Sequence, residues 1–522
     1  MRRASGAASG LVSHDPANSV RNGHDTLSRD PLMDLVAAPD RVRELERLSR
    51  DWPSWSVSPT ELIHLEMLLS GGYSPLRALM DRHTYAMCEQ RSRLPDGTLW
   101  PLPLALEVTA ERARAIQPAE PLVLRDHEGL AIAVMRVSDG WHDQSGHWRI
   151  GGDVEGLRLP EHHDFSTLRL TPDEVRLQIQ RRGWIRIIAL HVAAETDLGA
   201  IERGCHRAAQ LDAGVVILPL VSAGDAATPI HYARIRSIRA ETDRFEAMSL
   251  VSLLPAAVPL GTRRGALLGA LVAANLGCTH AFVDGAALDR DLADAGASAS
   301  DLAVVPMPLP LPAGAGEQDQ RRPSVPASPA GRPRGLTLFF TGLSGSGKSA
   351  IANAVRARLL ERGDRPVTLL DGDLVRQHLS SDLGFSRADR DRNIRRIGFV
   401  AAEITRHGGI AICAPIAPYD HVRRKIREQI EAVGAFVLVF VSTPLDVCEQ
   451  RDRKGLYAKA RAGLLKEFTG VSDSYEAPTD AELVIDTTDS TIRESADRVL
   501  GYLEGAGLLP PDGHGPHQSG SP

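Results

Sequence analysis

Residues 342–349 read Gly342-Leu343-Ser344-Gly345-Ser346-Gly347-Lys348-Ser349 and match the phosphate-binding pattern G-x-x-x-x-G-K-[ST]. An apolar run, 336–340, precedes this segment and a helical pattern, 350–360, follows it. The order predicts a strand, a glycine-rich loop and a helix. Backbone N–H groups of such a loop, together with the positive end of the helix, face a polyphosphate.

The two residues that close the pattern have separate predicted roles. Lys348 is expected to pair with the β- and γ-phosphates, and Ser349 to be a ligand of Mg²⁺. The sequence therefore predicts Mg²⁺ as cofactor with ATP as co-substrate. The predicted ATP-binding residues are Gly342, Leu343, Ser344, Gly345, Ser346, Gly347, Lys348 and Ser349.

The composition of the chain limits the classes of protein to which it can belong. The chain has 522 residues, which suggests two to four domains at ~150 residues each. A net charge of −6 gives no general case for a nucleic-acid or membrane partner. Five scattered cysteines lack metal or redox spacing, and no apolar run reaches the ~18 residues of a membrane span. We expect reduced thiols and a cytoplasmic protein without an export signal.

Polar and proline-rich segments divide the chain. Residues 1–30 and the tail 509–522 are expected to be disordered, and 306–334 forms a Pro/Ala/Gly linker. Short β-like runs in the region 31–170 indicate a β-rich domain. In 171–305 strand-like runs alternate with helical patterns, which indicates a parallel α/β layer. In 335–508 the same alternation predicts an α/β fold with a doubly wound parallel sheet and ligands at the carboxyl ends of its strands.

An acidic pair, Asp371 and Asp373, lies at such a strand end. Phosphoryl transfer to an alcohol needs one carboxylate for the hydroxyl proton and another to help hold Mg²⁺. We predict Lys348, Asp371 and Asp373 as catalytic residues. The alternative is an acidic turn that caps the next helix.

Two basic segments follow. The first, 383–396, is rich in arginine, whose guanidinium groups suit phosphate and sulfate oxygens, and its Phe385 could stack on a purine. The alternative is a solvated basic helix face with Phe385 in the core. The second, 451–461, occupies the place of a closing lid, and the alternative is a surface helix rich in charges.

Together these segments resemble adenylylsulfate kinase (APS kinase) from about 335 to 505. The resemblance rests on the phosphate loop, D-G-D at 371–373, L-G-F-S-x-x-D-R-x-x-N-I-R-R at 383–396, A-P-I-A-P-Y at 414–419, K-G-L-Y-A-K-A-R at 454–461 and F-T-G at 468–470. It implies transfer of the ATP γ-phosphoryl group to the 3′-hydroxyl of adenosine 5′-phosphosulfate (APS), giving PAPS and ADP in sulfate assimilation.

The resemblance also implies residue roles. Asp373 is the base or orienting carboxylate, and Asp371 lies near the metal. Phe385 and Phe468 clamp the substrate adenine. The implied substrate-binding residues are Arg376, Phe385, Arg390, Asn393, Ile416, Lys454, Arg461 and Phe468. Ala417 stands where some family members have a phosphorylated serine, which direct transfer does not need.

The N-terminal region resembles ATP sulfurylase. The pattern is carried by 58–62, 68–76 and 94–101, and continues through 219–221, 254–257 and 277–280. The resemblance implies a PUA-like β-rich domain at 31–170 and a Rossmann-like α/β domain at 171–305.

The family's nucleotide-site residues are replaced in this chain. Its Q-T-R-N-P-L-H-R-A-H reads here as 191–200, with Ala193 in place of arginine and Asp197 and Ala200 in place of the histidines. Its G-R-D-H-A loop has become 284–288, and Pro259 replaces a further arginine. Displacing pyrophosphate from ATP requires dense positive charge. We therefore predict that sulfurylase activity is absent.

Three other interpretations stay open. The chain could be a bifunctional PAPS synthase that retains sulfurylase activity. Its N-terminal half could be a binding or assembly module. The kinase could act on a sugar or another nucleotide, although the arginines and paired phenylalanines speak against a sugar. The expected partners are ATP and APS, with a homodimer or a complex with a separate sulfurylase.

Overall fold

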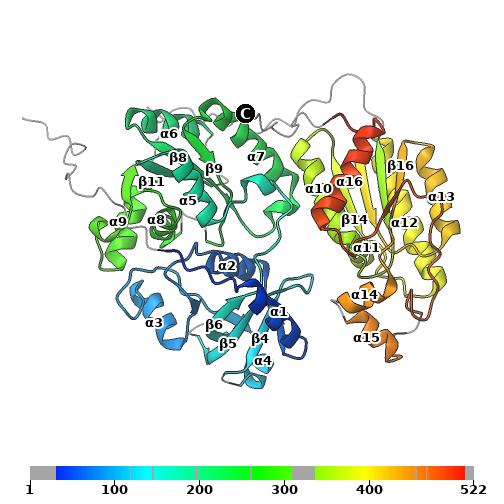
Figure 1. Cartoon of the computed structure of the whole chain (residues 1–522), viewed down its shortest axis with the longest axis horizontal. Helices are drawn as coiled ribbons and strands as arrows, with labels where there is room; N and C mark the ends of the chain where they lie inside the picture. The colour runs from blue at the N-terminus through cyan, green and yellow to red at the C-terminus, as the bar shows by residue number, and fades with distance from the viewer. Residues whose placement is uncertain are drawn as a thin grey trace, which may run out of the picture.

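The computed structural model describes residues 31–117, 119–143, 146–193, 198–258, 262–308, 335–452, 455–465 and 467–511. It contains three sheets, one in each of three regions (Figure 1). Residues 1–30, the linker residues 309–334 and residues 512–522 lie outside the described residues. The disordered tail was predicted to begin at residue 509, but Leu509 is 3% exposed and belongs to the core of the third region.

The first region is built on a β-rich sheet. Its strand order is β1-β4-β5-β6-β2, and β3 pairs with β6. Every pairing is antiparallel except β1 with β4. The strands are β1 (Ser54–Ser56), β2 (Ala78–Leu79), β3 (Leu106–Val108), β4 (Pro121–Arg125), β5 (Ala131–His142) and β6 (Trp148–Gly156). The helices are α1 (Pro39–Leu48), α2 (Pro59–Leu69), α3 (Arg82–Arg91) and α4 (Ala110–Ala115).

The second region is a parallel α/β layer in the order β10-β8-β7-β11-β12, with β9 beside β8. Its central strands β7 and β8 are buried along their whole length, as expected for a sheet with helices on both faces. The strands are β7 (Ile187–Val192), β8 (Gly214–Val221), β9 (Ser249–Val251), β10 (Leu254–Pro255), β11 (His280–Val283) and β12 (Val305–Pro308). The helices are α5 (Pro172–Arg181), α6 (Gly199–Gln210), α7 (Pro229–Thr242), α8 (Gly265–Asn275) and α9 (Gly285–Asp294).

Strand β12 corrects one predicted boundary. The linker was expected from residue 306, but Val305–Pro308 pairs in parallel register with β11. Prolines at an edge strand are compatible with pairing because the missing N–H can face away from the ladder. The segment 306–308 therefore belongs to the sheet.

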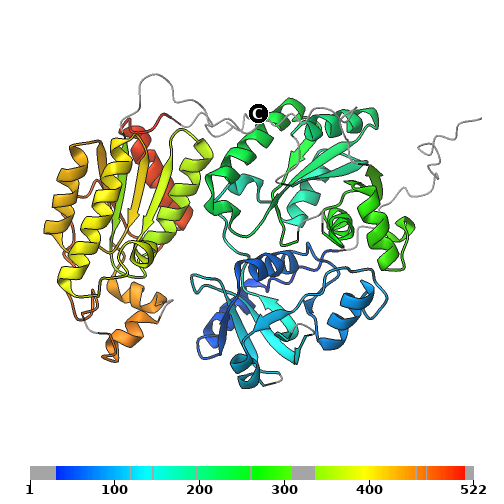
Figure 2. The ribbon, with the colours of Figure 1, turned by 180° about the vertical axis from the view of Figure 1, so that it is seen from behind.

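The third region is a five-stranded parallel sheet in the order β14-β15-β13-β16-β17. Chain order and sheet order differ in the way that a doubly wound sheet requires, with helices on both faces (Figure 2). The strands are β13 (Leu336–Thr341), β14 (Val367–Asp371), β15 (Ile410–Ala414), β16 (Ala435–Val441) and β17 (Leu483–Ile485). The helices are α10 (Lys348–Arg362), α11 (Gly372–His378), α12 (Arg387–Arg406), α13 (Asp420–Glu431), α14 (Leu445–Arg451), α15 (Leu456–Arg461) and α16 (Ile492–Gly505). The predicted fold class is confirmed.

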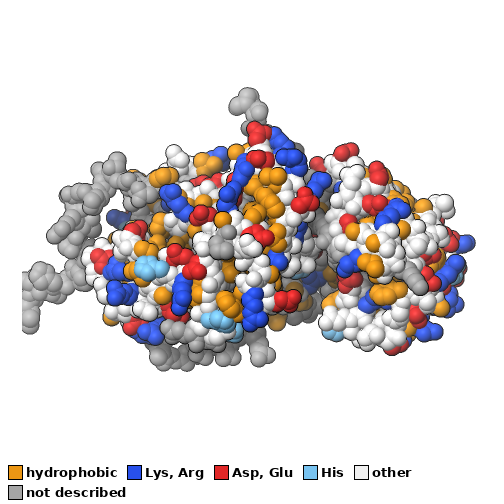
Figure 3. Space-filling view, turned by 90° about the horizontal axis from the view of Figure 1, so that it is seen from below, with side chains coloured by type: hydrophobic (Ala, Val, Ile, Leu, Met, Phe, Trp, Pro, Cys, Tyr) orange, Lys and Arg blue, Asp and Glu red, His pale blue; other side chains and the backbone are white. Residues whose placement is uncertain are grey.

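Helix α10 of the third region lies beside α7 of the second, as both ribbon views show. Buried apolar residues of the two regions form one continuous cluster that includes Ile235 of α7 and Val355 of α10. Arg356 Nη2 donates to the carbonyl oxygen of Ala227 at 2.6 Å. The surface seen from below carries acidic and basic side chains interspersed, in keeping with the small net charge (Figure 3).

Candidate phosphoryl-transfer site

The phosphate-binding loop follows β13 and runs directly into α10, as the sequence predicts. Gly345 and Gly347 have φ values of 75° and 96°, a region that favours glycine. A Cβ on Gly342 would lie 2.4 Å from the carbonyl oxygen of Val441. The glycines are therefore needed both for backbone conformation and for close packing.

Lys348 is the first residue of α10 and is 7% exposed. Its Nζ donates to the carbonyl oxygen of Leu343 at 2.6 Å, across the loop. The ammonium group thus lies within the loop, where a polyphosphate would bring the β- and γ-oxygens.

Ser349 and Asp371 meet at the carboxyl end of β14. Ser349 Oγ donates to Asp371 Oδ2 at 2.7 Å, and Asp371 Oδ1 accepts the Asp373 N–H at 3.0 Å. Asp371 is therefore also the N-cap of α11, so the capping interpretation is correct and is compatible with a catalytic one. A hydroxyl and a carboxylate are the hard oxygen donors that Mg²⁺ takes beside phosphate oxygens. The residues present fit Mg²⁺.

Arg376 and Phe385 lie together near this edge. The guanidinium carbon of Arg376 is 4.4 Å from the centre of the Phe385 ring, and Nη1 donates to Gly384 O at 3.0 Å. Burial, reinforced by the charge of Arg390, lowers the pKa of Arg376. Phe385 is 66% exposed, which excludes a core position for it. An exposed aromatic ring is available for stacking on a base.

Arg390 connects Phe385 to the segment that carries Phe468. Its Nε donates to Phe385 O at 2.9 Å, and its Nη1 donates to Thr469 Oγ1 at 2.7 Å and Asp473 Oδ2 at 2.6 Å. Phe468 is half-buried and meets Tyr457 edge to face at 5.1 Å. Arg390 thus connects the backbone of Phe385 to Thr469, the residue that follows Phe468.

Asn393 follows Arg390 by one turn of α12. It is 4% exposed, and its Oδ1 accepts no hydrogen bond within the described chain. A buried side-chain carbonyl oxygen that accepts no hydrogen bond is uncommon in proteins. A hydroxyl group of a bound ligand could donate the missing hydrogen bond. This observation fits the predicted substrate-binding role.

Ile416 approaches the loop through its backbone. Its carbonyl oxygen accepts from Thr341 Oγ1 at 2.6 Å. The next residue, Ala417, has φ 44°, a left-handed conformation that costs free energy in a residue with a Cβ and recurs at functional sites.

The residues of the predicted lid, 451–461, have different surroundings in the structure. Tyr457 of α15 donates its hydroxyl to Ser344 O at 2.8 Å, so this segment contacts the phosphate loop. Arg461 pairs with Glu449 of α14 and is largely exposed, and its substrate-binding role stays a prediction. Lys454 lies outside the described residues.

Sequence reasoning missed several residues of this site, among them Asp473, Thr443, Thr487 and Tyr457. The hydroxyls of Thr443 and Thr487 both reach Ser346 O. No local pattern marks either threonine, because each lies just beyond the end of a different strand. Tyr457 could have been found, since it stands within the basic segment 451–461.

The corresponding edge of the second region lies at the carboxyl ends of β7, β8 and β11. Ala193 and Ala200 stand where the family has arginine and histidine, and Asp284 caps α9. His191 is buried without a partner for Nε2, and burial lowers its pKa to about 4. One guanidinium does lie here, since Arg234 donates to Val192 O at 2.6 Å and Leu220 O at 3.0 Å. Asp197 and Pro259 are outside the described residues.

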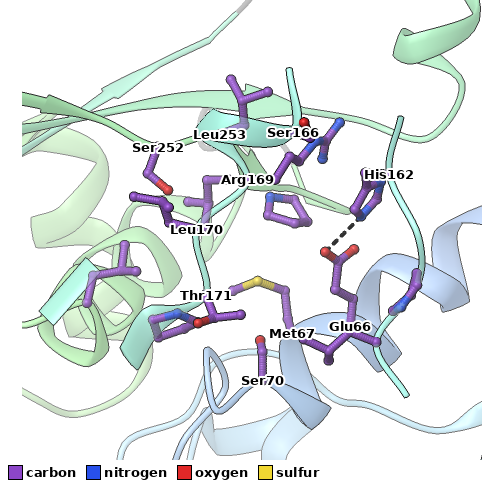
Figure 4. Close-up of a pocket in the computed structure, with 16 residues that line it drawn as sticks. Glu66, Met67, Ser70, His162, Ser166, Arg169, Leu170, Thr171, Ser252 and Leu253 are labelled. Atoms are coloured by element: carbon purple, nitrogen blue, oxygen red, sulfur yellow. Dashed lines mark hydrogen bonds and ion pairs between the residues drawn. The ribbon is translucent and has the colours of Figure 1, made fainter. Parts of the chain in front are cut away.

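A separate cavity of about 240 Å³ lies between the first two regions (Figure 4). His162 Nε2 and Glu66 Oε1 lie within hydrogen-bond distance at 2.8 Å on its wall, and Arg169, also on the wall, is paired with Asp164. No residue of the phosphate loop lines it. Its charged groups satisfy one another, so we assign it no part in the chemistry.

All five cysteines are buried, and none of them is part of a disulfide in the described residues. No helix in the described ranges has both the length and the apolar content needed to cross a bilayer.

Family models match three successive parts of the chain. A model described as PUA-like domain matches 26–156, ATP-sulfurylase matches 166–294, and adenylylsulphate kinase matches 334–486.

Relatives match nearly the whole chain. A protein of Phaeosphaeria nodorum named sulfate adenylyltransferase is 34% identical and is matched over 92% of this chain and 98% of its own. One of the same name from Mycosarcoma maydis is 33% identical over 91% and 98%. A solved structure, the hexameric APS kinase from Thiobacillus denitrificans, is 37% identical over 92% and 98%, with a TM-score of 0.51. The chain therefore belongs to the sulfate adenylyltransferase family and carries PUA-like, ATP-sulfurylase and adenylylsulphate kinase domains in that order.

Proposed function

We propose that the C-terminal domain transfers the γ-phosphoryl group of ATP to the 3′-hydroxyl of APS, giving PAPS and ADP. One observation carries the proposal: Ser349, Asp371 and Asp373 meet beside a phosphate loop. The adenylylsulphate kinase match and the name of the structural relative support it.

The residues divide the work in the following way. Loop amides and Lys348 bind the β- and γ-phosphates. Ser349 and Asp371 would hold Mg²⁺, which would supply charge neutralisation at the phosphoryl oxygens. Phe385 and Phe468 hold the adenine of APS, while Arg376, Arg390 and Asn393 hold its ribose and phosphosulfate.

The 3′-oxygen of APS bonds to the γ-phosphorus of ATP. As this bond forms, Asp373 accepts the proton of the 3′-hydroxyl. The bond to the β,γ-bridging oxygen breaks, and ADP leaves with the electron pair. Catalysis thus depends on positioning the two substrates and on stabilising the charge of the transferred phosphoryl group, without a covalent enzyme intermediate.

The test is formation of PAPS from APS and MgATP by the full chain, followed by chromatography of the nucleotides. We expect turnover by the wild type and its loss in Lys348→Ala. A full chain that binds MgADP but forms no PAPS contradicts the proposal.

A second candidate is a bifunctional enzyme that also makes APS from sulfate and ATP. It is favoured by the curated relatives, which are named sulfate adenylyltransferase and are matched over most of this chain. These relatives do not support the prediction that sulfurylase activity is absent. Against the candidate stand Ala193 and Ala200, which remove cationic groups from the strand edge.

A molybdate-dependent pyrophosphate-release assay distinguishes the monofunctional kinase from the bifunctional enzyme. Pyrophosphate release well above a no-enzyme control establishes the bifunctional enzyme. Release at background, in a preparation that makes PAPS from APS, leaves a kinase whose ATP-sulfurylase domain serves as a binding or assembly module.

Two expectations stay proposals. We propose a homo-oligomer, because the structural relative is named hexameric, and sedimentation of the full chain tests it against the monomer and the complex with a separate sulfurylase. We also propose a cytoplasmic location, which fractionation of the source cells tests.

A further inference from the structure

Side chains from other segments of the chain hold two carbonyl groups of the phosphate loop, those of Ser344 and Ser346. Tyr457 holds the carbonyl of Ser344, as described above. Ser346 O lies within hydrogen-bond distance of two threonine hydroxyls, Thr487 Oγ1 at 3.0 Å and Thr443 Oγ1 at 3.2 Å.

Holding Ser346 O fixes the direction of the next N–H. A trans peptide is planar, so its C=O and its N–H point in opposite directions. With Ser346 O turned toward the threonines, the Gly347 N–H points to the opposite side, into the loop. Gly347 has φ 96° and no Cβ, so its own preference does little to prevent this peptide from turning over.

The two threonines come from different strand ends. Thr443 follows β16 and Thr487 follows β17, and their hydroxyl oxygens are 2.8 Å apart. They are 3% and 7% exposed, so water does not compete freely for the same carbonyl. The Thr487 N–H also donates to Thr443 Oγ1 at 3.2 Å, which fixes the position of that hydroxyl.

Arg451, the last residue of α14, fixes the position of the Thr487 hydroxyl. Its Nη1 donates to Thr487 Oγ1 at 2.7 Å and its Nη2 to Thr487 O at 2.7 Å. A hydroxyl has one proton to donate. Because an Arg451 N–H occupies one acceptor position of Thr487 Oγ1, the Thr487 proton goes either to Ser346 O directly or to Thr443 Oγ1, 2.8 Å away, and in the second case the Thr443 proton goes to Ser346 O.

We propose that Thr443 and Thr487, with Arg451 behind them, are positioning residues that hold the Ser346–Gly347 peptide in the orientation that binds the β-phosphate. The inference rests on the proposed function only in requiring a nucleotide in this loop. None of the three side chains needs to touch the reacting atoms.

The test compares hydroxyl removal here with hydroxyl removal at a matched pair elsewhere. Thr443→Val and Thr487→Val, singly and together, keep side-chain shape but remove the donors. The control is Thr405→Val, because Thr405 and Thr337 form a buried hydroxyl pair of 2.7 Å away from the loop. Binding of MgADP to the full chain is measured by calorimetry, and thermal unfolding is measured in parallel.

We expect each single variant to weaken MgADP binding ~5-fold and the double variant ~20-fold, from the usual strength of one hydrogen bond. The KM for ATP should rise in proportion, while the KM for APS stays within about twofold because APS does not contact this peptide. Thr487→Ser, which restores the donor, should restore MgADP affinity. Thr405→Val should lower the melting temperature without changing MgADP affinity.

MgADP affinity within twofold of wild type in a folded double variant overturns the inference, as does an equal loss in Thr405→Val. If the double variant does not fold, the comparison of Thr487→Val with Thr487→Ser gives the same decision. Failure of the proposed function is distinguishable, because a wild type that binds MgADP without forming PAPS leaves this inference intact.

Discussion

At the residue scale, Asp371 shows that structural and catalytic roles can coincide. One carboxylate oxygen caps α11 and the other accepts from Ser349, so the same side chain fixes Asp373 and reaches the expected metal position. Capping leaves the second oxygen available, since an ionised carboxylate has about four acceptor positions. An acidic turn before a helix is therefore weak evidence against catalysis.

We predict that Asp373→Asn lowers kcat for APS phosphorylation by ~10²-fold or more, because the amide cannot accept the hydroxyl proton. MgADP affinity and melting temperature should stay unchanged, since Asp373 is exposed and its N–H bond to Asp371 is retained. Steady-state kinetics beside calorimetry checks this. A kcat within twofold of wild type would remove Asp373 from the mechanism.

We predict that Ser349→Ala raises the Mg²⁺ concentration needed for half-maximal kinase rate by about tenfold, because one hard oxygen donor is lost beside Asp371. Excess EDTA should abolish activity in wild type. The measurement is a Mg²⁺ titration at saturating ATP and APS, with Ser490→Ala, on a loop beyond β17, as the control. An unchanged Mg²⁺ requirement would contradict the assignment of Ser349 as a ligand.

At the element scale, packing of α12 on α13 depends on the absence of a side chain. A Cβ on Gly398 of α12 would lie 2.7 Å from Ile426 Cγ1 of α13, and Ile426 is 1% exposed. Because α12 also carries Arg390 and Asn393, a shift of this helix would displace the substrate groups.

We predict that Gly398→Ala destabilises the chain by ~1–3 kcal/mol through overpacking, although alanine favours helix by about 1 kcal/mol. Gly501→Ala on α16 is the matched control, since no atom lies within 4 Å of its Cβ position, and it should stabilise by ~0.5–1 kcal/mol. Urea unfolding of both variants checks this. Equal effects of the two substitutions would show that helix propensity, and not packing against α13, determines the change in stability at Gly398.

At the scale of the whole molecule, the second and third regions share a boundary that contains a buried acid. Glu361 of α10 accepts the Phe165 N–H, and burial raises the pKa of Glu361 to about 7 despite that bond. Asp164 lies nearby, and although burial opposes it, bonds from His231 and Arg169 lower the pKa of Asp164 to about 2. The boundary thus has one carboxyl that titrates near neutral pH.

We predict that stability of the full chain falls between pH 5 and pH 8 through Glu361. Its folded pKa of about 7 exceeds the ~4.3 of an unfolded chain, so its stabilising contribution is full below about pH 4.3 and is lost as pH rises through 7. The loss is up to about 3 kcal/mol. Asp164 adds nothing in this window, because its contribution is lost only at more acidic pH.

Glu361→Gln, which stays neutral, should remove the decline and give a higher melting temperature than wild type at pH 8. Melting temperatures from pH 5 to pH 8 check this, with exposed Glu403→Gln on α12 as the control. A wild type whose stability is flat across the window would contradict the prediction.

The sequence predicts the strand-loop-helix at 336–360, the acids at 371 and 373 and the arginines of α12, because each is a contiguous pattern whose geometry is local. It places the linker start wrongly, at 306, because proline content hides the pairing of β12 with β11. The expected substrate-binding role of Arg461 stays a prediction, and in the structure this side chain has an ion pair with Glu449 that no spacing rule marks.

What the sequence determined by itself is the chemistry that the chain can hold: a phosphate loop, a hydroxyl and carboxylates for a metal, and guanidinium groups for an anionic substrate. Short-range backbone geometry is enough for each of these. The tertiary structure alone decided which distant groups support them. Thr443 and Thr487 are 44 residues apart and meet at Ser346 O only because β16 and β17 are neighbours in the sheet. Strand order, which depends on the packing of the whole core, has no local signature.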